Sequence, residues 1–456
     1  MEVEIISKEC IKPSSPTPPN LRTHKLSLLD QIDAAAHFPL IIFYPMNQST
    51  SHAAVDNFFQ RSQLLKQSLS EVLTRFYVFA GTIKDNLSID CNDKGVYYLE
   101  ARVNCRLVDC LSQPNLPSFE KFIPRDYTWK ETGAGDDHVA MIKVTSFTCG
   151  GMAIGILVSH MIADGTSLNI FLKGWAAMAR KACDEAVYPN FDAPSIFPQN
   201  VACLREEASF MSFCRPFLKL GKFTTRRIVF DASAITSLKA KATSKSVQNP
   251  TRVEVVSALL WKCIMAASNQ KSGIQSQGPT FITLSVNLRG RAAPPLPESS
   301  IGNLYWRAGA LCTPEEMELA YMVSKLREAI TNVSPGFVKG LQGDGGFHKL
   351  CEHVKAMAGA CSSATNSCGM DYIGFTSWCN FGVYDIDFGW GKPVWVSCIG
   401  LNEDLDLRFP STIALMDTRS VGGIEAWLYL DKEVMAILAQ DKEILALGSW
   451  DPSPIN

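Results

Sequence analysis

The chain has 456 residues, which is too long for one hydrophobic core of average size, so we expect two domains. Its net charge of −2 gives no reason to expect binding to nucleic acid or to an anionic membrane surface. Hydrophobic residues make up 46% of the chain and charged residues only 19%, which predicts a large interior and fits an apolar tunnel.

The N-terminus and the cysteines indicate a cytoplasmic protein. Residues 1–9 carry acidic side chains where a signal peptide would be basic, and no stretch approaches the ~18–20 apolar residues of a membrane span. The 15 cysteines are scattered without a Cys-x-x-Cys pair, so neither a zinc site nor a disulfide framework is indicated. We therefore expect reduced thiols, no metal and no membrane contact.

The first hundred residues predict short strands and one helix. Apolar periodicity and turn residues favour strands at 5–7, 39–44 and 96–102, a helix at 58–74 and a hairpin at 76–91. Between the first two strands, the proline-rich residues 12–19 are expected to be extended and irregular.

A hairpin in the middle of the first half leads into the most informative stretch of the chain. Residues 139–147 and 152–159 are short apolar and β-branched runs, and glycines supply the turn between them. Residues 167–178 place apolar side chains at helical spacing. His160 therefore leaves the end of a buried strand, and Asp164 stands where a helix begins and a carboxylate is favoured.

The sequence His160-x-x-x-Asp164-Gly165 predicts a catalytic base. An imidazole with an ordinary pKa of ~6.5 is suited to accept a hydroxyl proton at neutral pH. A single histidine at a strand end is more often structural. A second motif, Asp387-Phe388-Gly389-Trp390-Gly391, changes that balance, because the two motifs in this order and at this spacing are far more specific than either alone.

On these two motifs the chain resembles the plant BAHD acyltransferase family, which transfers acyl groups from coenzyme A thioesters to alcohols or amines. The resemblance covers essentially the whole chain. It implies an α/β fold of two similar-sized domains, each a mixed β-sheet flanked by helices, as in chloramphenicol acetyltransferase. Condensation domains of non-ribosomal peptide synthesis share the first motif but usually carry a second histidine, where this chain has Ser159.

The N-terminal segment resembles one branch of this family. Residues 6–18 and 28–31 are similar to the branch that includes vinorine synthase, deacetylvindoline acetyltransferase and salutaridinol acetyltransferase. Those enzymes acetylate bulky polycyclic alkaloid alcohols, and terpenoid acetyltransferases fall near the same pattern. The resemblance therefore implies a rigid polycyclic acceptor, alkaloid or terpenoid, and a wide apolar pocket.

The second half predicts a further strand and helix series. We expect an N-terminal domain at 1–185, a crossover at 186–222 and a C-terminal domain at 223–456, with residues 211–221 of the crossover near the acceptor. The resemblance also implies that strands just after Asp387 return to the first domain. The expected elements are strands at 225–231, 281–289, 302–310, 412–417 and 423–429, helices at 233–245 with Ser233 near the cap, 251–262 capped by Thr251, 315–332 and 432–447, and a glycine-rich loop at 336–346.

The resemblance assigns roles to the motif residues. His160 would be the general base, and Asp164 would point away from it in an ion pair that fixes the turn, with Arg289 as the expected partner. Arg289 as an ordinary surface cation fits the sequence equally well. The Asp387 loop would be structural, since Gly389 and Gly391 flanking Trp390 suit a tight loop buried under an aromatic, and Asp387 would need a cation such as Arg289 or Arg291.

Substrate contacts are expected at two places. Thr376, Ser377 and Trp378 match positions that line the active-site centre in the family, although a buried aromatic there is otherwise ordinary core. A threonine hydroxyl there would hydrogen-bond the developing oxyanion or an acceptor oxygen. Coenzyme A phosphates need cations, and basic side chains cluster near a helix start, although such clusters are usually a solvated face. These side chains are Lys239, Lys241, Lys245 and Arg252.

The sequence thus predicts an acyl-CoA-dependent O-acyltransferase that moves acetyl from acetyl-CoA to a hydroxyl of a polycyclic plant metabolite. No cysteine or serine stands in a recognisable nucleophile setting, so direct transfer is preferred to an acyl-enzyme. Acetyl-CoA would be a co-substrate, no cofactor would stay bound, and the enzyme would be a monomer. The alternatives are a non-catalytic partner protein, a larger acyl-CoA, and a phenolic or amine acceptor.

Overall fold

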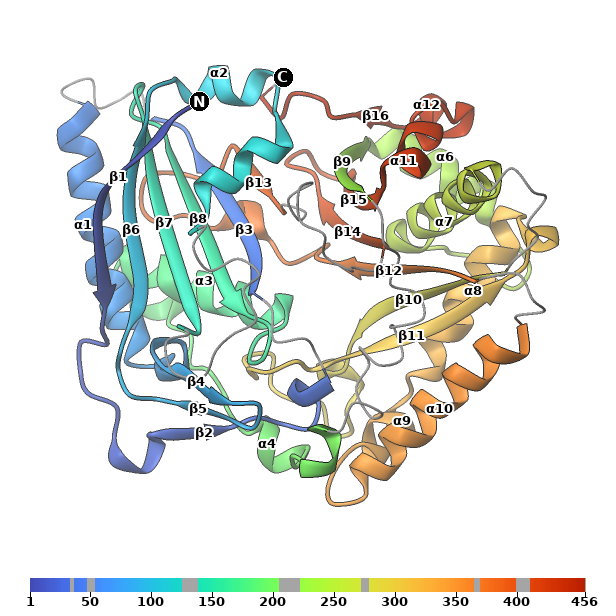
Figure 1. The fold of residues 1–456 in the computed structure, drawn as a ribbon, viewed down its shortest axis with the longest axis horizontal. Helices are drawn as coiled ribbons and strands as arrows, with labels where there is room; N and C mark the ends of the chain where they lie inside the picture. Colours follow the sequence, from blue (N-terminus) through green and yellow to red (C-terminus); the bar gives the residue numbers. More distant parts are fainter. Residues whose placement is uncertain are drawn as a thin grey trace.

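The computed structural model describes residues 1–32, 37–46, 54–124, 138–204, 222–271, 279–364, 370–398 and 411–455. Two large mixed sheets stand side by side, each covered by helices (Figure 1). This is the α/β architecture of two sheet-containing halves that the sequence predicts. None of the helices in these ranges is long and apolar enough to cross a membrane.

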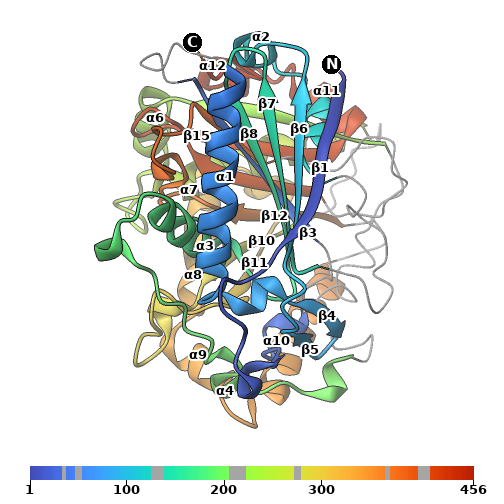
Figure 2. The ribbon, with the colours of Figure 1, turned by 90° about the vertical axis from the view of Figure 1, so that its left-hand side faces the viewer.

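The first sheet has the order β1-β6-β7-β8-β3-β13, and only β6 and β7 run parallel. Helices α1 (Ala54–Leu73) and α3 (Gly165–Ala179) pack against each other on one side of it (Figure 2). The 3-10 segment Leu116–Phe122 contacts the other face, so the central strand β8 is buried along its whole length. The strands are β1 (Val3–Ile11), β3 (His37–Tyr44), β6 (Val96–Val103), β7 (Ala140–Phe147), β8 (Met152–Ser159) and β13 (Trp395–Ser397).

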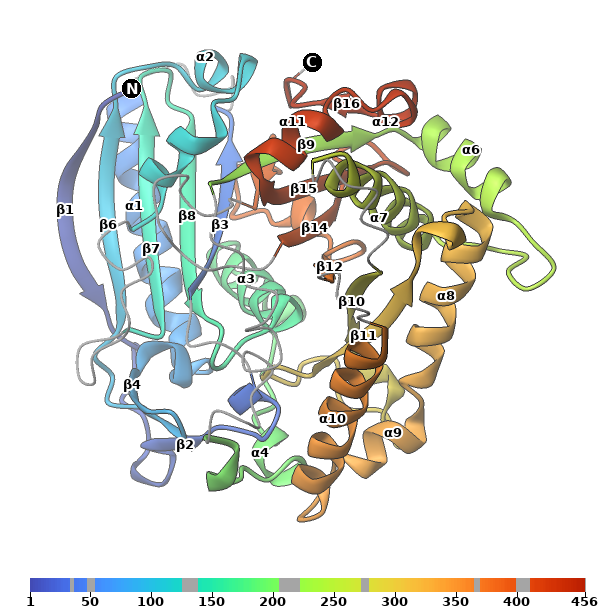
Figure 3. The ribbon, with the colours of Figure 1, turned by 45° about the vertical axis from the view of Figure 1, so that its right-hand side comes forward.

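The second sheet has the order β11-β10-β12-β14-β15-β9-β16, with β10, β12 and β14 parallel. Helices pack around a second core that includes the fully buried Trp261 (Figure 3). The strands are β9 (Phe223–Phe230), β10 (Thr280–Asn287), β11 (Tyr305–Cys312), β12 (Asp371–Ser377), β14 (Ser411–Asp417), β15 (Ile424–Asp431) and β16 (Ser449–Trp450). The helices include α6 (Ala232–Ala242), α7 (Arg252–Lys271), α8 (Leu319–Asn332) and α10 (Gly346–Ala364).

The two halves exchange segments. Strand β13, which follows the Asp387 loop, pairs antiparallel with β3 and completes the first sheet, as the family resemblance implied. In the opposite direction, Leu28, Leu29 and Ile32 from the N-terminal part pack into the second core. A small third sheet of β2 (Thr23–Lys25), β5 (Ser88–Asp90) and β4 (Thr82–Asp85) lies beside the first. The domain boundaries at 185 and 222 stay predictions.

A buried ion pair stands at the junction of the halves. Arg227 of β9 donates from Nη1 to Glu425 Oε2 of β15 at 3.0 Å, and both side chains are buried. The Arg227 guanidinium lies 4.7 Å from the ring centre of Trp395, which belongs to β13 of the first sheet. Trp395 Nε1 and the Tyr384 hydroxyl also donate to Glu425. This cluster joins the second sheet to the first.

Three local predictions were wrong. The glycine-rich stretch at 336–346 is not a plain loop, because α9 (Pro335–Gly340) occupies its first half, and α10 follows it. The closing helix at 432–447 is broken into α11 (Lys432–Leu438) and α12 (Lys442–Leu447), since Asp441 caps a new helix. The helix predicted at 233–245 already ends at Ala242, whereas its N-cap, Asp231, accepts from Ala234 N at 2.7 Å with Ser233 beside it, as expected. The crossover residues 211–221 lie outside the described residues.

Candidate active site

The turn between β8 and α3 has the predicted form. His160 follows directly on the last residue of β8, and Asp164 is the N-cap of α3, with Oδ1 accepting from Ser167 N at 2.7 Å. A capped helix start fixes the path of the five-residue turn, because the cap satisfies an amide that would otherwise lack a partner. The imidazole therefore projects from a rigid junction between a buried strand and a helix.

Asp164 forms a bidentate ion pair with Arg289. The distances are 2.7 Å from Nη1 to Oδ2 and 3.1 Å from Nη2 to Oδ1, and the residues are only 5% and 3% exposed. Leu304 N also donates to Oδ2, at 3.2 Å. With Ser167 N this makes four donors on one carboxylate, which uses its acceptor capacity. Asp164 therefore holds the turn and the segment before β11.

Arg289 fastens the same segment from the other side. Its Nε and Nη2 donate to Ser300 O at 3.0 and 2.8 Å, and Nη2 also lies 3.0 Å from Ser167 Oγ. Strand β10 ends at Asn287, so Arg289 sits in a 3-10 turn just beyond the strand that was expected to contain it. One guanidinium thus ties α3 of the first half to the segment 300–304 of the second.

The His160 ring contacts Asn303, which the sequence analysis did not single out. His160 Nδ1 lies 3.0 Å from Asn303 Oδ1, and Asn303 Nδ2 donates to His160 O at 2.6 Å. Asn303 Nδ2 also donates to Asp30 Oδ1 at 3.0 Å. Asp30 belongs to residues 28–31, which resemble one branch of the family, and Asn303 to the strand expected at 302–310, but neither stretch indicates a contact with His160.

Aromatic rings surround His160. Phe38 of β3 packs edge-on against the imidazole at 5.0 Å between ring centres, and Tyr305 of β11 lies 6.2 Å away. Phe38 also contacts Trp378 at 6.1 Å. These rings come from both halves of the protein, so the histidine lies between the two sheets in a largely apolar setting. Such a setting suits an apolar acceptor.

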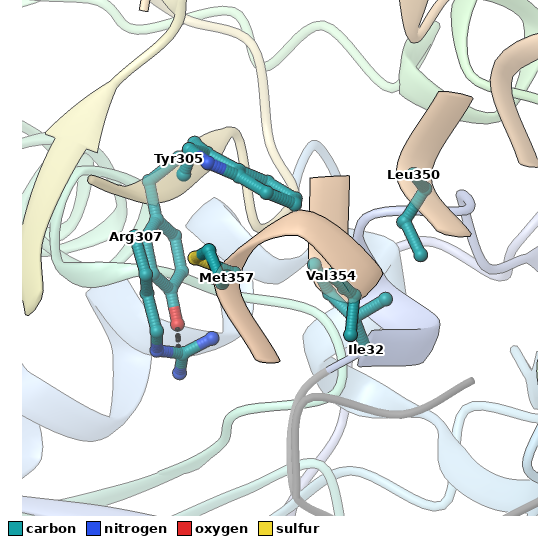
Figure 4. Close-up of a pocket in the computed structure, with 7 residues that line it drawn as sticks. Ile32, Tyr305, Arg307, Leu350, Val354 and Met357 are labelled. Carbon is teal, nitrogen blue, oxygen red and sulfur yellow. Dashed lines mark hydrogen bonds between the residues drawn. The ribbon is translucent and has the colours of Figure 1, made fainter. Parts of the chain in front are cut away.

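A pocket lies next to Tyr305, between the edge strand β11 and helix α10 (Figure 4). Its polar groups include the Tyr305 hydroxyl and the Arg307 guanidinium, joined by a hydrogen bond of 2.7 Å from Nη2. The lining residues are Ile32, Tyr305, Trp306, Arg307, Leu350, Val354 and Met357.

The predicted stretch 376–378 is only partly brought to His160. Trp378 is 8% exposed and reaches the histidine through Phe38, and its backbone N donates to Leu415 O. Thr376 is half-buried in β12. Ser377 Oγ accepts from Cys379 N at 3.4 Å, within its own turn. Roles for Thr376 and Ser377 in substrate binding stay predictions.

The Asp387 loop is arranged as a tight turn, but the prediction that Asp387 pairs with Arg289 or Arg291 was wrong. Asp387 Oδ1 accepts from Gly389 N at 2.7 Å and from Gly391 N at 2.9 Å, and both glycines have a φ of +106°. Among the described residues neither expected arginine contacts it, because Arg289 is used by Asp164 and Arg291 donates to two backbone carbonyls of α8 and its end. The carboxylate needs no cation, since two amides of its own tight turn satisfy it.

The loop packs onto the first half. Trp390 stacks with Phe388 at 5.7 Å and meets Tyr44 of β3 edge-on at 6.0 Å. Phe388 packs against Trp175 of α3 at 4.8 Å, and Arg180 at the end of α3 donates to Asp387 O. The loop thus fastens β13 to α3, the helix that begins at Asp164.

The basic cluster is not brought to His160. Helix α6, which carries Lys239 and Lys241, lies at the outer edge of the second half, far from α3 (Figures 1 and 3). Lys245 follows in an exposed loop. Arg252 is engaged with Asp417 at 3.0 Å and with Asn380. Their role as contacts for coenzyme A phosphates stays a prediction.

The described residues hold no arrangement of three His, Cys, Asp or Glu side chains that could bind a metal ion. The cysteines whose side chains the structure describes are thiols that form no disulfide. Cys149, in the turn at the far end of the β7–β8 hairpin, accepts from Leu107 N at 3.3 Å.

The chain is similar to known proteins over almost its whole length. Residues 1–445 match the family described as the Transferase family. The chain is 51% identical over 460 residues to epi-neemfruitin B 7-O-acetyltransferase of Melia azedarach and 50% identical over 467 residues to limonoid 7-O-acetyltransferase of Citrus sinensis. Both alignments cover 100% of each protein. The fold matches the crystal structure of vinorine synthase with a TM-score of 0.80 and 34% identity, over 98% of both chains.

Proposed function

The chain belongs to the Transferase (BAHD) family of acyl-CoA-dependent acyltransferases, and on that premise we propose that it transfers acetyl from acetyl-CoA to the 7-hydroxyl of a limonoid-type polycyclic terpenoid. The observation that carries the proposal is the full-length identity of about half to two limonoid 7-O-acetyltransferases, in a chain that keeps the His160 turn. It favours a terpenoid over the alkaloid that the sequence left equally open.

His160 is proposed as the general base. Its Nε2 takes the proton of the acceptor hydroxyl as that oxygen attacks the thioester carbonyl carbon. The tetrahedral intermediate then expels the coenzyme A thiolate, which receives the proton from the imidazolium. The products are the acetate ester and free coenzyme A, so no acyl-enzyme is needed. A positioned base typically contributes ~100- to 10,000-fold.

The surroundings of His160 support a bulky apolar acceptor. Phe38 and Tyr305 pack beside the imidazole, and Trp378 packs on the Phe38 ring, so the side chains around the base are largely apolar.

The test is a competition assay with purified protein. Acetyl-CoA is offered with a limonoid that has a free 7-hydroxyl, a polycyclic indole-alkaloid alcohol, shikimate and an anthocyanin, and products are identified by mass. We expect the limonoid 7-acetate to dominate, and its formation to fall at least ~100-fold in His160→Ala. Product mass is preferred to thiol release, because the protein's own free cysteines would react with a thiol reagent.

Each alternative has its own outcome. His348→Ala, at an exposed histidine of α10, is the matched control and should keep full activity. Preferred use of benzoyl-CoA or malonyl-CoA would overturn the acetyl donor, and preference for shikimate or the anthocyanin would overturn the acceptor. Undiminished transfer by His160→Ala would overturn the base. Absence of turnover with every donor and acceptor would favour a non-catalytic partner protein.

We also propose that the enzyme is monomeric and cytoplasmic. The free thiols described above are typical of a reducing compartment. Light scattering after size-exclusion chromatography and a fluorescent fusion would test the two statements separately.

A further inference from the structure

Asn303 lies between the imidazole of His160 and the carboxylate of Asp30. Its side chain is 143 residues from His160 along the chain and is fixed by three hydrogen bonds: Oδ1 with His160 Nδ1, and Nδ2 with His160 O and Asp30 Oδ1. The residue is 1% exposed and Asp30 is 2% exposed. Buried polar groups of this kind keep their partners, because an unsatisfied donor or acceptor is costly.

The orientation of the Asn303 amide follows from its neighbours. A backbone carbonyl oxygen can only accept a hydrogen bond, and so can an ionised carboxylate. Both lie on the side of Nδ2, at 2.6 and 3.0 Å, so that side must be the NH₂ group. A flipped amide would bring Oδ1 against two acceptors. Oδ1 therefore faces His160, where it too can only accept.

Asp30 is held as an acceptor by its own surroundings. Oδ2 accepts from Ser27 N at 2.8 Å and from Ser27 Oγ at 2.6 Å, while Oδ1 accepts from Asn303 N at 2.7 Å and from Nδ2. Burial raises the pKa of the Asp30 carboxyl, and the hydrogen bonds from Ser27 and Asn303 oppose that rise. Three of the four donors are N–H groups, which suit a carboxylate, while the Ser27 hydroxyl can also accept. The His160 carbonyl is therefore the contact that fixes the Asn303 amide in either protonation state of Asp30.

The backbone around Asn303 is fixed from both sides. Asn303 N donates to Asp30 and Leu304 N donates to Asp164, so two consecutive backbone amides are hydrogen-bonded to buried carboxylates. Gly302, which precedes them, has a φ of +139°, a conformation that a residue with a side chain rarely adopts. The segment therefore presents Asn303 to the histidine with little freedom.

We propose that Asn303, oriented by Asp30, is a positioning residue that holds His160 in the tautomer with the proton on Nδ1, so that Nε2 carries the lone pair that accepts the acceptor's proton. This inference rests on the proposed role of His160 as the base. A carboxylate in place of the amide would also stabilise the imidazolium, whereas the neutral amide fixes the ring while favouring return of the proton to the thiolate.

The first test reads the tautomer directly in the wild-type protein. Protein labelled with ¹⁵N-histidine is examined by long-range ¹H–¹⁵N correlation at pH 8, above the ordinary imidazole pKa of about 6.5. Among the 7 histidines, His160 is assigned by the loss of its signals in His160→Ala. We expect the Nδ1–H pattern for His160. The Nε2–H pattern would overturn the proposal without any need for a further variant.

The second test compares variants by spectrum and kinetics. In Asn303→Ala we expect a shift towards Nε2–H and a fall in kcat of about 10- to 100-fold, with the KM for acetyl-CoA unchanged. Asp30→Asn should act in the same direction but less strongly. Asn332→Ala and Asp344→Asn, at exposed positions, are the matched controls and should match the wild type in both readouts.

The outcomes separate this proposal from the proposed function. An Asn303→Ala protein that keeps the Nδ1–H pattern, or that changes tautomer without losing kcat, would overturn the positioning role. If Asn303→Ala does not fold, the wild-type spectrum and Asp30→Asn still decide. If no limonoid is acetylated, the proposed function fails, while the tautomer of His160 and its dependence on Asn303 are still measured.

Discussion

The buried Asp164 carboxylate should be costly to remove, because its partner is a buried cation. In Asp164→Ala the Arg289 guanidinium, 3% exposed, stays buried without its counter-charge. Breaking one partner of a buried pair costs about 3–5 kcal/mol of unfolding free energy. Urea unfolding should show this loss, and kcat should fall because the segment carrying Asn303 loosens.

The stability loss in Asp164→Ala should be compared with the losses on removing two other carboxylates. Asp387→Ala removes the acceptor of two turn amides but leaves no cation unpaired, so we expect a smaller loss of about 1–3 kcal/mol. Asp109→Ala breaks an exposed ion pair with Arg106 and should not change stability measurably. If Asp164→Ala unfolds like the wild type yet is inactive, Asp164 has a direct role in catalysis instead.

At the scale of elements, β8 depends on a glycine where the 3-10 segment Leu116–Phe122 crosses it. A Cβ at Gly155 would lie 1.9 Å from Phe122 O, a backbone atom that cannot move aside. Gly155→Ala should therefore destabilise by about 3 kcal/mol or more, as overpacking does. In Gly359→Ala of α10 the new Cβ meets nothing within 4 Å, so a gain of about 0.5–1 kcal/mol is expected. Thermal melting should move in opposite directions.

Helix α7 begins with a capping arrangement that is sensitive to pH. Thr251 N donates to Glu254 Oε2 at 2.7 Å, Glu254 N donates to Thr251 Oγ1, and Arg327 of α8 donates to Glu254 Oε1 at 2.8 Å. Burial acts to raise the pKa of Glu254, but the hydrogen bonds from Arg327 and Thr251 outweigh it, so the pKa lies below its ordinary value of 4.5.

The sign of the pH effect follows from that lowered pKa. The ionised Glu254 stabilises the fold fully above pH 4.5, and this contribution is lost as the pH falls through the lower, folded-state pKa. Glu254→Gln should cost about 1–2 kcal/mol at pH 7 in urea unfolding, and the difference from the wild type should shrink below pH 4.5. Glu328→Gln, exposed on α8, should show neither effect. A difference that does not depend on pH would contradict the assignment.

At the scale of the whole molecule, the Arg227–Glu425 pair connects the two sheets. Arg227→Met leaves the buried Glu425 without its cation and should lower the free energy of unfolding by about 3–5 kcal/mol. Adding Glu425→Leu removes the stranded charge and should restore part of the loss. Arg226→Met, at the preceding residue of β9, breaks an ion pair with the partly exposed Asp451 and should cost much less. A double variant no more stable than Arg227→Met would contradict this reading.

Most helices and strands were predicted from signals between residues close together in the sequence. The β7–β8 hairpin, α3 and its Asp164 cap depend on neighbours within a few residues, where apolar period, glycine turns and capping act. The same rules failed at α9, where a capping serine followed by proline started a short helix inside a glycine-rich stretch. They also failed at α12, because one aspartate cap outweighed a continuous apolar period.

The sequence by itself determined the family and the strand–turn–helix that carries His160, and the family resemblance offered Arg289 as a partner of Asp164 without excluding a surface position. The structure decided for the buried pair. Only the tertiary structure decided that Asn303 and Asp30 meet the imidazole, that Phe38 packs on it, and that Asp387 is satisfied by its own turn. A turn or a cap is set by sterics and hydrogen bonds between near neighbours. The partner of a buried side chain depends on which strands lie side by side, and residues 30, 160 and 303 become neighbours only when both sheets have formed.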